Sequence, residues 1–248
     1  YQRTGLYDIG ALPATLGMEA AGIIEEAGKE VKGFSVGDRV AYAMSLGSYS
    51  EARIMTTDRL VKLPGDIDDQ TAAAMMLQGM TAQYLLKSSY TVKAGDVVLI
   101  MAAAGGVGQI ISQWAKHLGA SVIGCVGSPE KAEAAKAAGC DHTILYGSED
   151  VATRVNDITN GEGVPVSYDS IGQATLQASL DSLAPTGTLV SYGNASGPIT
   201  NFNPGTLAAK GSLYMQRPTL ATYTRNRQLL DAVAHDLFAV VNSGNVNI

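Results

Sequence analysis

A cluster of small residues stands where an apolar run gives way to an amphipathic one. The stretch MAAAGGVGQIISQWAKHLGA, residues 101–120, places Gly105, Gly106 and Gly108 within four positions. Directly after a buried strand and at the start of a helix, such a cluster is typical of a loop that binds the pyrophosphate of a dinucleotide. The helix start offers unpaired amides and a partial positive charge, and both attract that anion.

The cluster matches the pattern G-x-G-x-x-G imperfectly. Ala103 takes the first glycine position, Gly105 the second and Gly108 the third. We expect a side chain at Gly105 to block the pyrophosphate, and Gly108 to let helix and sheet approach closely. Gly106 and Val107 belong to the same predicted cofactor-binding loop. No Gly-Lys-Ser/Thr follows, which excludes a Walker-type phosphate loop. The alternative is a tight strand–helix turn without a ligand.

The end of the second strand discriminates between the two nicotinamide dinucleotides. An NAD site would carry Asp or Glu there, but the chain reads GCVGSPEK, and its strand ends at Gly127 and Ser128. We predict that Ser128 caps the next helix and that Lys131 falls in its first turn, where the helix dipole disfavours a cation. A 2′-phosphate beside Lys131 would compensate for that position, so the predicted cofactor is NADP(H). The alternative is a solvated lysine beside Glu130.

The elements around these residues follow an alternating pattern after residue 93. Helical patterns separate strand-like runs at 96–103, 121–126, 141–145, 164–169, 187–193 and 211–217. Gly119 and Gly139 stand where two of the helices should end. Strands joined by single helices predict a doubly wound parallel sheet, the Rossmann fold, which binds ligands at the carboxyl ends of its strands. Further cofactor-binding residues are therefore expected at those ends: Tyr146, which could instead be a plain sheet-edge tyrosine, Ser170, Tyr192, Gly193 and Asn194.

The first 80 residues and the last 27 do not follow this alternation of strands and helices. The runs AAGIIEEAG, GDRVAYAM and YSEARIM predict short strands of a β-rich unit, with a turn at Gly37-Asp38. The segment TYTRNRQLLDAVAHDLFAVVNSG predicts one long helix that ends near Gly244. We therefore expect an α/β protein in which a β-rich part accompanies the nucleotide-binding sheet.

Composition excludes several classes of protein. The net charge of −6 argues against a nucleic-acid or anionic-membrane partner. Cys125 and Cys140 are the only cysteines, too few for a disulfide-dense secreted scaffold. No apolar run approaches the about 20 residues that a membrane span needs. We expect a cytoplasmic protein with no membrane insertion.

Seven blocks together resemble one family. They are AAAGGVGQIISQWAKHLGA, VGSPEKAEAAKAAG, VSYGNASGP, GSLYMQRPTL, YQRTGLY, LGMEAAGIIEEAG and VGDRVAY. They resemble the NADPH:quinone oxidoreductases, the zeta-crystallin-like branch of the medium-chain dehydrogenases/reductases. The resemblance implies a GroES-like catalytic domain with a nucleotide-binding domain inserted in it. It assigns 1–80 to the first catalytic piece, 81–218 to the Rossmann domain and 219–248 to the start of the return segment, with the catalytic domain truncated at both ends.

The resemblance also bears on zinc. Zinc-dependent relatives carry a histidine ligand just before the glutamate at this point, whereas here Met18 precedes Glu19. Methionine is a poor ligand for zinc, and no cysteine precedes Cys125. The three histidines are scattered over separate predicted elements. We predict a site without a metal.

The implied activity is zinc-independent reduction of a quinone by NADPH. A simple ketone would leave an alkoxide that needs a Lewis acid or proton donor, but a quinone leaves a stabilised phenolate and needs mainly positioning. The family assigns Tyr1 and Tyr7 to the catalytic pocket and Thr81 to the nicotinamide and pyrophosphate. It also implies a homodimer through the edge strand 211–217. The alternative for both tyrosines is that they simply fill a β-rich surface.

Three alternative hypotheses about the function stay open. The same scaffold could reduce α,β-unsaturated carbonyls or enoyl thioesters. It could instead bind NADPH without catalysis, or form a cofactor-binding fragment with an incomplete substrate pocket.

Overall fold

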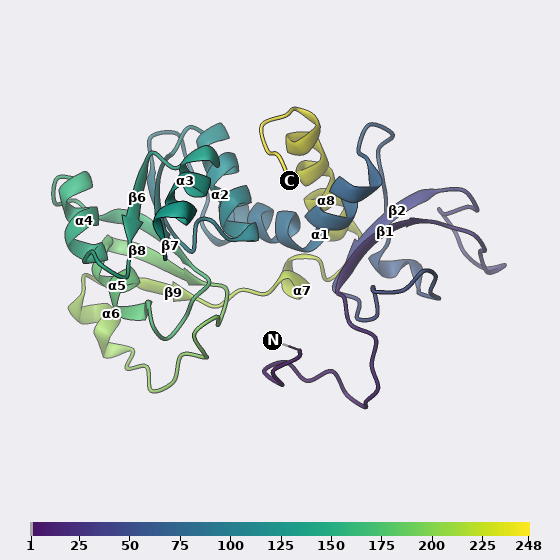
Figure 1. Cartoon of the computed structure of the whole chain (residues 1–248), viewed down its shortest axis with the longest axis horizontal. Helices are drawn as coiled ribbons and strands as arrows, with labels where there is room; N and C mark the ends of the chain where they lie inside the picture. Colours follow the sequence, from purple (N-terminus) through teal and green to yellow (C-terminus); the bar gives the residue numbers. More distant parts are fainter. Residues whose placement is uncertain (1) are drawn as a thin grey trace. The chain divides into compact units, whose positions relative to one another are not determined.

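The computed structural model describes residues 2–248, so Tyr1 lies outside the described residues. The chain divides into two compact units (Figure 1). The first contains the residues up to Met80 together with Tyr223–Ser243 and Ile248. The second contains Thr81–Thr222 and Gly244–Asn247. Each unit has its own sheet, and each is described by itself.

The second unit is built on a six-stranded sheet in the order β6-β5-β4-β7-β8-β9, with all neighbours parallel. Its strands are β4 (Val97–Met101), β5 (Ser121–Val126), β6 (His142–Leu145), β7 (Val164–Asp169), β8 (Leu183–Ser191) and β9 (Tyr214–Gln216). The order reverses between β4 and β7, and doubly wound sheets bind ligands at such a switch point. The structure therefore confirms the predicted nucleotide-binding fold.

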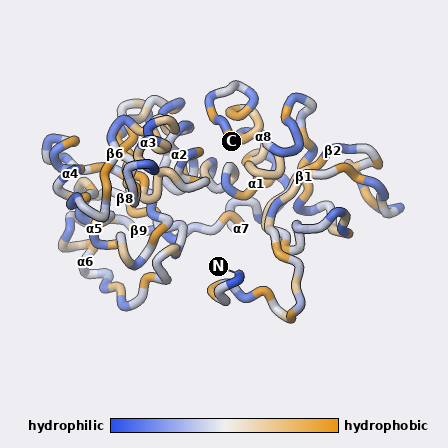
Figure 2. Tube along the Cα trace, viewed as in Figure 1, coloured by the Kyte–Doolittle hydropathy of each residue, from blue (hydrophilic) through white to orange (hydrophobic). Residues whose placement is uncertain are grey.

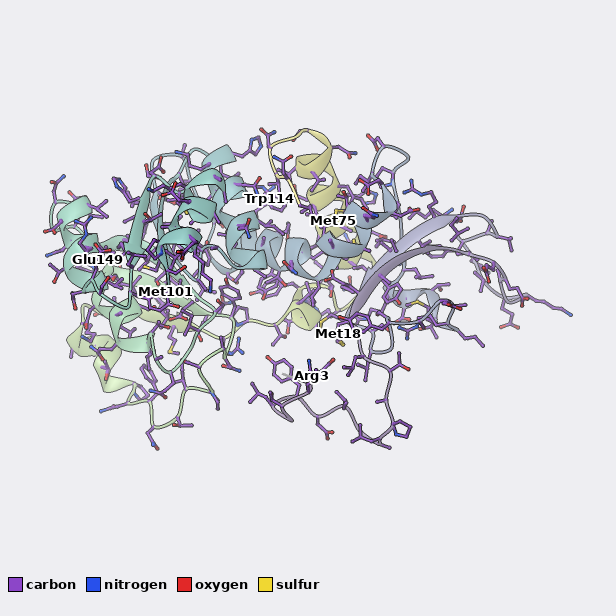
Figure 3. The ribbon with its side chains drawn as sticks, viewed as in Figure 1. Arg3, Met18, Met75, Met101, Trp114 and Glu149 are labelled. Atoms are coloured by element: carbon purple, nitrogen blue, oxygen red, sulfur yellow. The ribbon has the colours of Figure 1, made fainter. Side chains whose placement is uncertain are left out.

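A helix precedes these strands, and further helices connect them and cover both faces of the sheet. They are the π-helix η2 (Leu85–Ser89), α2 (Gly106–His117), α3 (Pro129–Ala137), α4 (Val151–Ile158), α5 (Leu176–Asp181) and α6 (Gly205–Ala209). Leu99 and Met101 of β4 share a core with α4 and α5, while Val98 and Ile100, which alternate with them, are equally buried. Such two-sided burial is typical of parallel sheets. Figure 3 labels two buried side chains of this unit, Met101 of β4 and Trp114 of α2.

Local signals in the sequence define the ends of the helices well. Gly119 and Gly139 follow α2 and α3 with φ values of +87° and +95°, a region that favours glycine. The Ser128 hydroxyl accepts a hydrogen bond from the Lys131 amide at 3.3 Å, and Pro129 opens α3. The predicted helix ends at Gly119 and Gly139 and the predicted capping by Ser128 are therefore confirmed. The strand expected at 187–193 begins earlier in the structure, where β8 runs from Leu183 to Ser191.

The first unit contains a three-stranded antiparallel sheet. Its strands are β1 (Glu19–Ile23), β2 (Arg39–Ala43) and β3 (Val61–Lys62), with the 3-10 helix η1 (Thr57–Arg59) before β3. Val40, Tyr42 and Leu60 form its small buried core. Gly37 has a φ of +90° in the turn before β2, as predicted. Figure 2 shows hydrophilic residues gathering in the loops that connect the strands.

Two expectations for this unit are wrong. The run YSEARIM forms no strand, because its polar groups bond elsewhere: Tyr49 donates its amide to Leu16, and Arg53 reaches the carbonyl of Ser45. The final helix is also broken into α7 (Leu220–Tyr223) and α8 (Arg227–Asn242). Asn226 takes an extended conformation there and caps α8, since its side chain accepts from the Leu229 amide at 2.9 Å.

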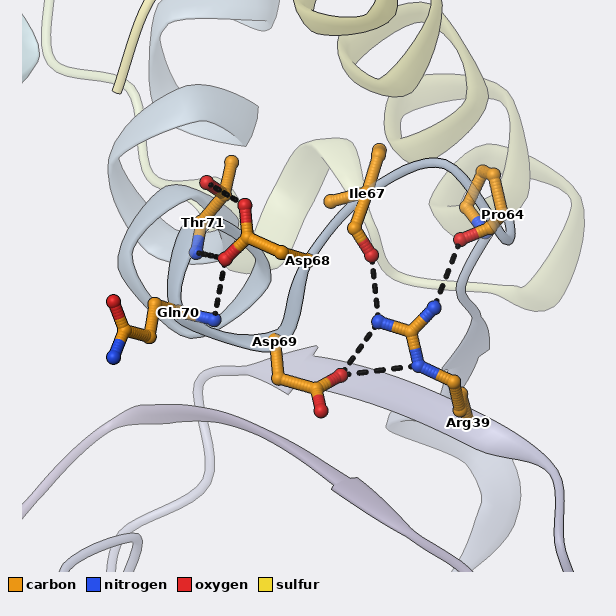
Figure 4. Close-up of polar contacts among 7 residues, drawn as sticks. All are labelled: Arg39, Pro64, Ile67, Asp68, Asp69, Gln70 and Thr71. Atoms are coloured by element: carbon orange, nitrogen blue, oxygen red, sulfur yellow. Dashed lines mark hydrogen bonds and ion pairs between the residues drawn. The ribbon is translucent and has the colours of Figure 1, made fainter.

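A long helix, α1 (Asp69–Tyr84), begins in the first unit and was not predicted. Asp68 caps it by accepting hydrogen bonds from the amides of Gln70 and Thr71, each at 2.9 Å (Figure 4). Arg39 ties its start to β2, since Nε bonds the Asp69 carboxylate at 3.0 Å. The helix is apolar on several sides, so its sequence lacks the amphipathic period that usually reveals a helix.

Candidate functional site: the carboxyl ends of the parallel strands

The small-residue cluster forms a tight turn between β4 and α2. The Ala103 amide donates to the Cys125 carbonyl at 3.0 Å, and the Gly105 amide donates to the Ala102 carbonyl at 2.8 Å. Ala102 has a φ of +58°, which L-residues rarely adopt. Gly105 is the N-cap of α2 and brings no side chain to the helix end. The first amides of α2 therefore face the space beyond β4.

The glycines of this turn serve two different purposes. A Cβ at Gly108 would overlap the carbonyl oxygen of Ala102 and lie 2.8 Å from that of Ala103, so this glycine lets the helix pack on the strand. A Cβ at Gly105 would meet only the Ala102 oxygen, at 3.1 Å, and Gly105 is exposed. A side chain there would occupy the open space in front of the helix. This backbone cradle fits a pyrophosphate.

Ala103 in the first glycine position also has a physical explanation. It is fully buried, and a Cβ at Gly124 of β5 would lie 2.8 Å from the Ala103 methyl group. The pair Ala103 and Gly124 therefore leaves room for one methyl group and no more. Alanine in place of the first glycine is therefore compatible with the tight turn between β4 and α2.

The residues expected near the adenosine end lie together at the ends of β5 and β6. A Cβ at Gly127 would lie 2.7 Å from the Tyr146 hydroxyl, so the tyrosine packs against the bare backbone at Gly127. Ser128 follows directly as the cap of α3, and Lys131 is exposed in the first turn of that helix. The four residues present a hydroxyl, an ammonium group and an aromatic ring at one corner of the sheet. This chemistry suits a phosphorylated ribose.

The loops after β7 and β8 touch closely. A Cβ at Gly193 would lie 2.8 Å from the Cα of Ser170, so only glycine allows the two backbones to approach. Tyr192 and Asn194, on either side of Gly193, are half-buried. The structure thus brings Ser170, Tyr192, Gly193 and Asn194 together beside the switch point.

Two residues of this region were missed by the sequence analysis. Arg217, after β9, donates to the Ser191 carbonyl at 3.0 Å, and its other terminal nitrogen lies 3.1 Å from the Asn194 amide oxygen in the orientation that satisfies both groups. Asp169 ends β7 and is 2% exposed. Arg217 and Asp169 could both have been found from the sequence, because each is a polar residue at the carboxyl end of a predicted strand.

Tyr7 and Thr81 belong to different units. Tyr7 lies in the first unit and is 45% exposed, so its ring is accessible to a ligand. Thr81 is half-buried on α1 and is the first residue of the second unit.

The comparisons with known proteins agree with this geometry. A family model described as zinc-binding dehydrogenase matches residues 106–235, and one described as alcohol dehydrogenase GroES-like domain matches residues 1–94. A quinone oxidoreductase from Pseudomonas aeruginosa is 51% identical over 100% of this chain and 77% of its own length. The chain belongs to the quinone oxidoreductase family. The fold class, a Rossmann-like sheet with a GroES-like part, is that of this family.

The chain is also similar to two other proteins whose names bear on the cofactor and the substrate. The crystal structure of an Escherichia coli quinone oxidoreductase complexed with NADPH has a TM-score of 0.96 and 45% identity, covering 99% of this chain and 76% of the other. A 2-haloacrylate reductase from a Burkholderia species is 47% identical over 98% of this chain and 75% of its own length.

The residues at the position where zinc-dependent relatives carry a histidine ligand do not fit zinc. Met18 offers a thioether, which zinc binds poorly. The next residue, Glu19, accepts a hydrogen bond from the Leu77 amide at 2.6 Å, and burial raises the pKa of its carboxyl. Over residues 2–248, no three His, Cys, Asp or Glu side chains are grouped so that they could hold a metal. Over the same residues, no helix is long and apolar enough to cross a membrane.

Proposed function

We propose that the protein reduces quinones with NADPH as hydride donor and without zinc. The observation that carries the proposal is the cradle of backbone amides at Gly105–Gly108, at the switch point of a chain in the quinone oxidoreductase family. When bound, NADPH supplies a hydride to the acceptor.

Each group of residues has a role in holding that cofactor. The amides from Gly105 to Gly108, with Val107 between them, bind the pyrophosphate. Ser128 and Lys131 bind the 2′-phosphate beside Gly127 and Tyr146, because a hydroxyl and an ammonium group are strong donors to phosphate. The nicotinamide half lies along a third group of residues: Thr81, Ser170, Tyr192, Gly193 and Asn194.

The acceptor side follows from the chemistry of the product. A reduced quinone carries its charge on a stabilised phenolate, so hydrogen-bond donors suffice and a Lewis acid is not needed. Tyr7 and Tyr1 are the proposed donors, with phenol groups that bond a quinone oxygen and rings that line an apolar pocket. We assign 1–80 and 219–248 to the catalytic domain and 81–218 to the nucleotide-binding domain.

The test is a parallel titration of the purified protein with NADPH and NADH, followed by an acceptor panel. We expect NADPH to bind more tightly, and its oxidation to accelerate with quinones more than with 2-alkenals or enoyl-CoA. Binding of NADPH without turnover of any acceptor would replace catalysis by a binding role. No binding of either nucleotide would overturn the proposal.

A second candidate function is reduction of an activated carbon–carbon double bond. The 47% identity to a 2-haloacrylate reductase favours it, since that substrate class also accepts hydride at a conjugated carbon. Including 2-chloroacrylate in the acceptor panel separates the two. Turnover of 2-chloroacrylate or alkenals in the absence of quinone turnover would favour this candidate.

We also propose a cytoplasmic homodimer that forms through β9. This strand is the last in the order of the six-stranded sheet, and its Tyr214 is 63% exposed. A strand at the edge of a sheet can continue that sheet into a second copy.

A further inference from the structure

We infer that Asp169 is a positioning residue, which holds the two loops proposed to carry the nicotinamide half of the cofactor. The inference rests on the proposed function but concerns a residue outside the proposed contact set. Asp169 is 2% exposed, so it acts through its neighbours rather than by touching the ligand.

The Asp169 carboxylate has four donors, all from the segment that follows β7. Oδ1 accepts from the amides of Ile171 at 2.7 Å and Gly172 at 3.0 Å. Oδ2 accepts from the hydroxyls of Thr175 and Ser179, each at 2.7 Å. A buried carboxylate is costly unless it is hydrogen-bonded, so four short bonds hold the turn and the start of α5 in one arrangement.

The turn after β7 also holds the loop after β8 by hydrogen bonds. The Ser170 carbonyl accepts from the Ala195 amide at 3.2 Å, and the Ile171 carbonyl accepts from the Ser196 amide at 2.8 Å. The carbonyl of Asp169 itself accepts from Tyr192 at 2.8 Å. These bonds continue the pairing of β7 and β8 beyond the end of the sheet.

Close contact makes this arrangement sensitive to small shifts. Gly193 lies against Ser170 with no room for a Cβ, and Gly172 lies close to the Gly197 carbonyl, which a Cβ would meet at 2.8 Å. Any displacement of the first loop must therefore move the second. Asp169 determines the position of both through a single side chain.

The substitution Asp169→Asn separates positioning from folding. Asparagine retains one oxygen for the amides of Ile171 and Gly172. Its NH2 group cannot accept from the hydroxyls of Thr175 and Ser179, which must rotate or lose their partner. The turn should therefore persist but loosen.

The experiment compares Asp169→Asn with Val155→Ala, which opens a cavity in the core on the same face of the sheet. Four quantities are measured: the Kd for NADPH, the kcat and the KM for a quinone, and the hydrogen-exchange rate of the 192–196 amides without cofactor. For Asp169→Asn we expect a Kd raised about tenfold, a lower kcat, a largely unchanged quinone KM and faster exchange at 192–196. For Val155→Ala we expect a lower Tm with an unchanged Kd and unchanged exchange in that loop.

The outcomes separate this inference from the proposed function. If the wild type binds NADPH and Asp169→Asn binds it equally well, with the same exchange at 192–196, Asp169 does not position the loops. If the wild type binds no NADPH, the proposed function fails, and the exchange data still decide whether Asp169 orders the loop. If Asp169→Asn does not fold, Ser179→Ala removes one of the four donors and should give the same changes at smaller size; no change in exchange there overturns the inference.

Discussion

Lys131 occupies a position that its own helix makes unfavourable. It lies in the first turn of α3, where the helix dipole favours the neighbouring Glu130 over a cation. Its side chain is exposed, and Ser128 and Tyr146 lie at the same corner of the sheet. A bound phosphate would give this lysine the partner that its helix does not supply.

We predict that Lys131→Ala weakens NADPH binding by about tenfold to a hundredfold, the value of a charged hydrogen bond, and leaves NADH binding nearly unchanged. The measurement is a pair of fluorescence titrations with the two nucleotides. Lys136→Ala is the matched control, because Lys136 lies on the same helix and pairs with Glu133 at 2.9 Å. Equal losses of NADPH and NADH in Lys131→Ala would contradict the 2′-phosphate assignment.

Glu19 shows how burial affects a carboxyl in the first unit. Burial raises its pKa above the ordinary value of 4.5, and the hydrogen bond from the Leu77 amide opposes that shift only in part. The folded state therefore binds this proton more tightly than the unfolded state. The contribution of Glu19 to the free energy of unfolding falls as pH rises from the unfolded pKa through the folded one.

We predict that Glu19→Gln gains stability relative to wild type as the pH rises from about 4 to about 7, because glutamine cannot ionise and keeps an oxygen for the Leu77 amide. Urea denaturation at several pH values measures the difference. Glu26→Gln, at an exposed position in the same unit, should show no such trend. A stability difference that is flat with pH would show that Glu19 titrates alike in both states.

At the scale of elements, the start of α2 combines two demands on one short turn. The helix must approach β4 closely, and its first amides must stay open. Gly108 meets the first demand and Gly105 the second, so the two glycines should fail in different ways when substituted.

We predict that Gly108→Ala lowers the free energy of unfolding by about 1–3 kcal/mol, since its Cβ would overlap the carbonyl oxygens of Ala102 and Ala103, directly after β4. Gly105→Ala should keep most of the stability and lose NADPH affinity. Thermal unfolding and nucleotide titration of both variants test this. If Gly105→Ala bound NADPH normally, the pyrophosphate could not lie in front of that residue.

The sequence predicted some elements better than others, for identifiable reasons. Strong end signals such as Ser128-Pro129, Gly119 and Gly139 act within one turn of chain, so α2 and α3 end where expected. By contrast, α1 is buried on several sides and has no amphipathic period. The break at Asn226 depends on one side-chain hydrogen bond inside an otherwise helical pattern.

At the scale of the whole molecule, the edge strand β9 is the feature with consequences for assembly. Tyr214 is exposed on it, while Met215 packs against the core of the second unit. A second copy that paired at this edge would lie against the exposed Tyr214.

We predict that Tyr214→Glu converts the proposed dimer to a monomer, because burying a charge in the interface is costly and the strand edge loses an apolar contact. Light scattering after gel filtration should show half the mass. Tyr49→Glu is the control, since Tyr49 is 78% exposed in the other unit. A wild type that is monomeric at micromolar concentration would rule out this interface.

The sequence by itself determined the alternation of strands and helices after residue 93, the capping of α3 and the glycine turn at 105–108. These depend on neighbours a few positions apart, so local chemistry suffices to predict them. Only the tertiary structure revealed that Asp169 has four donors, that Arg217 meets Asn194, and that Gly193 lies against Ser170. Such contacts join segments that follow different strands, and they exist only after the parallel sheet has brought the carboxyl ends of those strands to one edge.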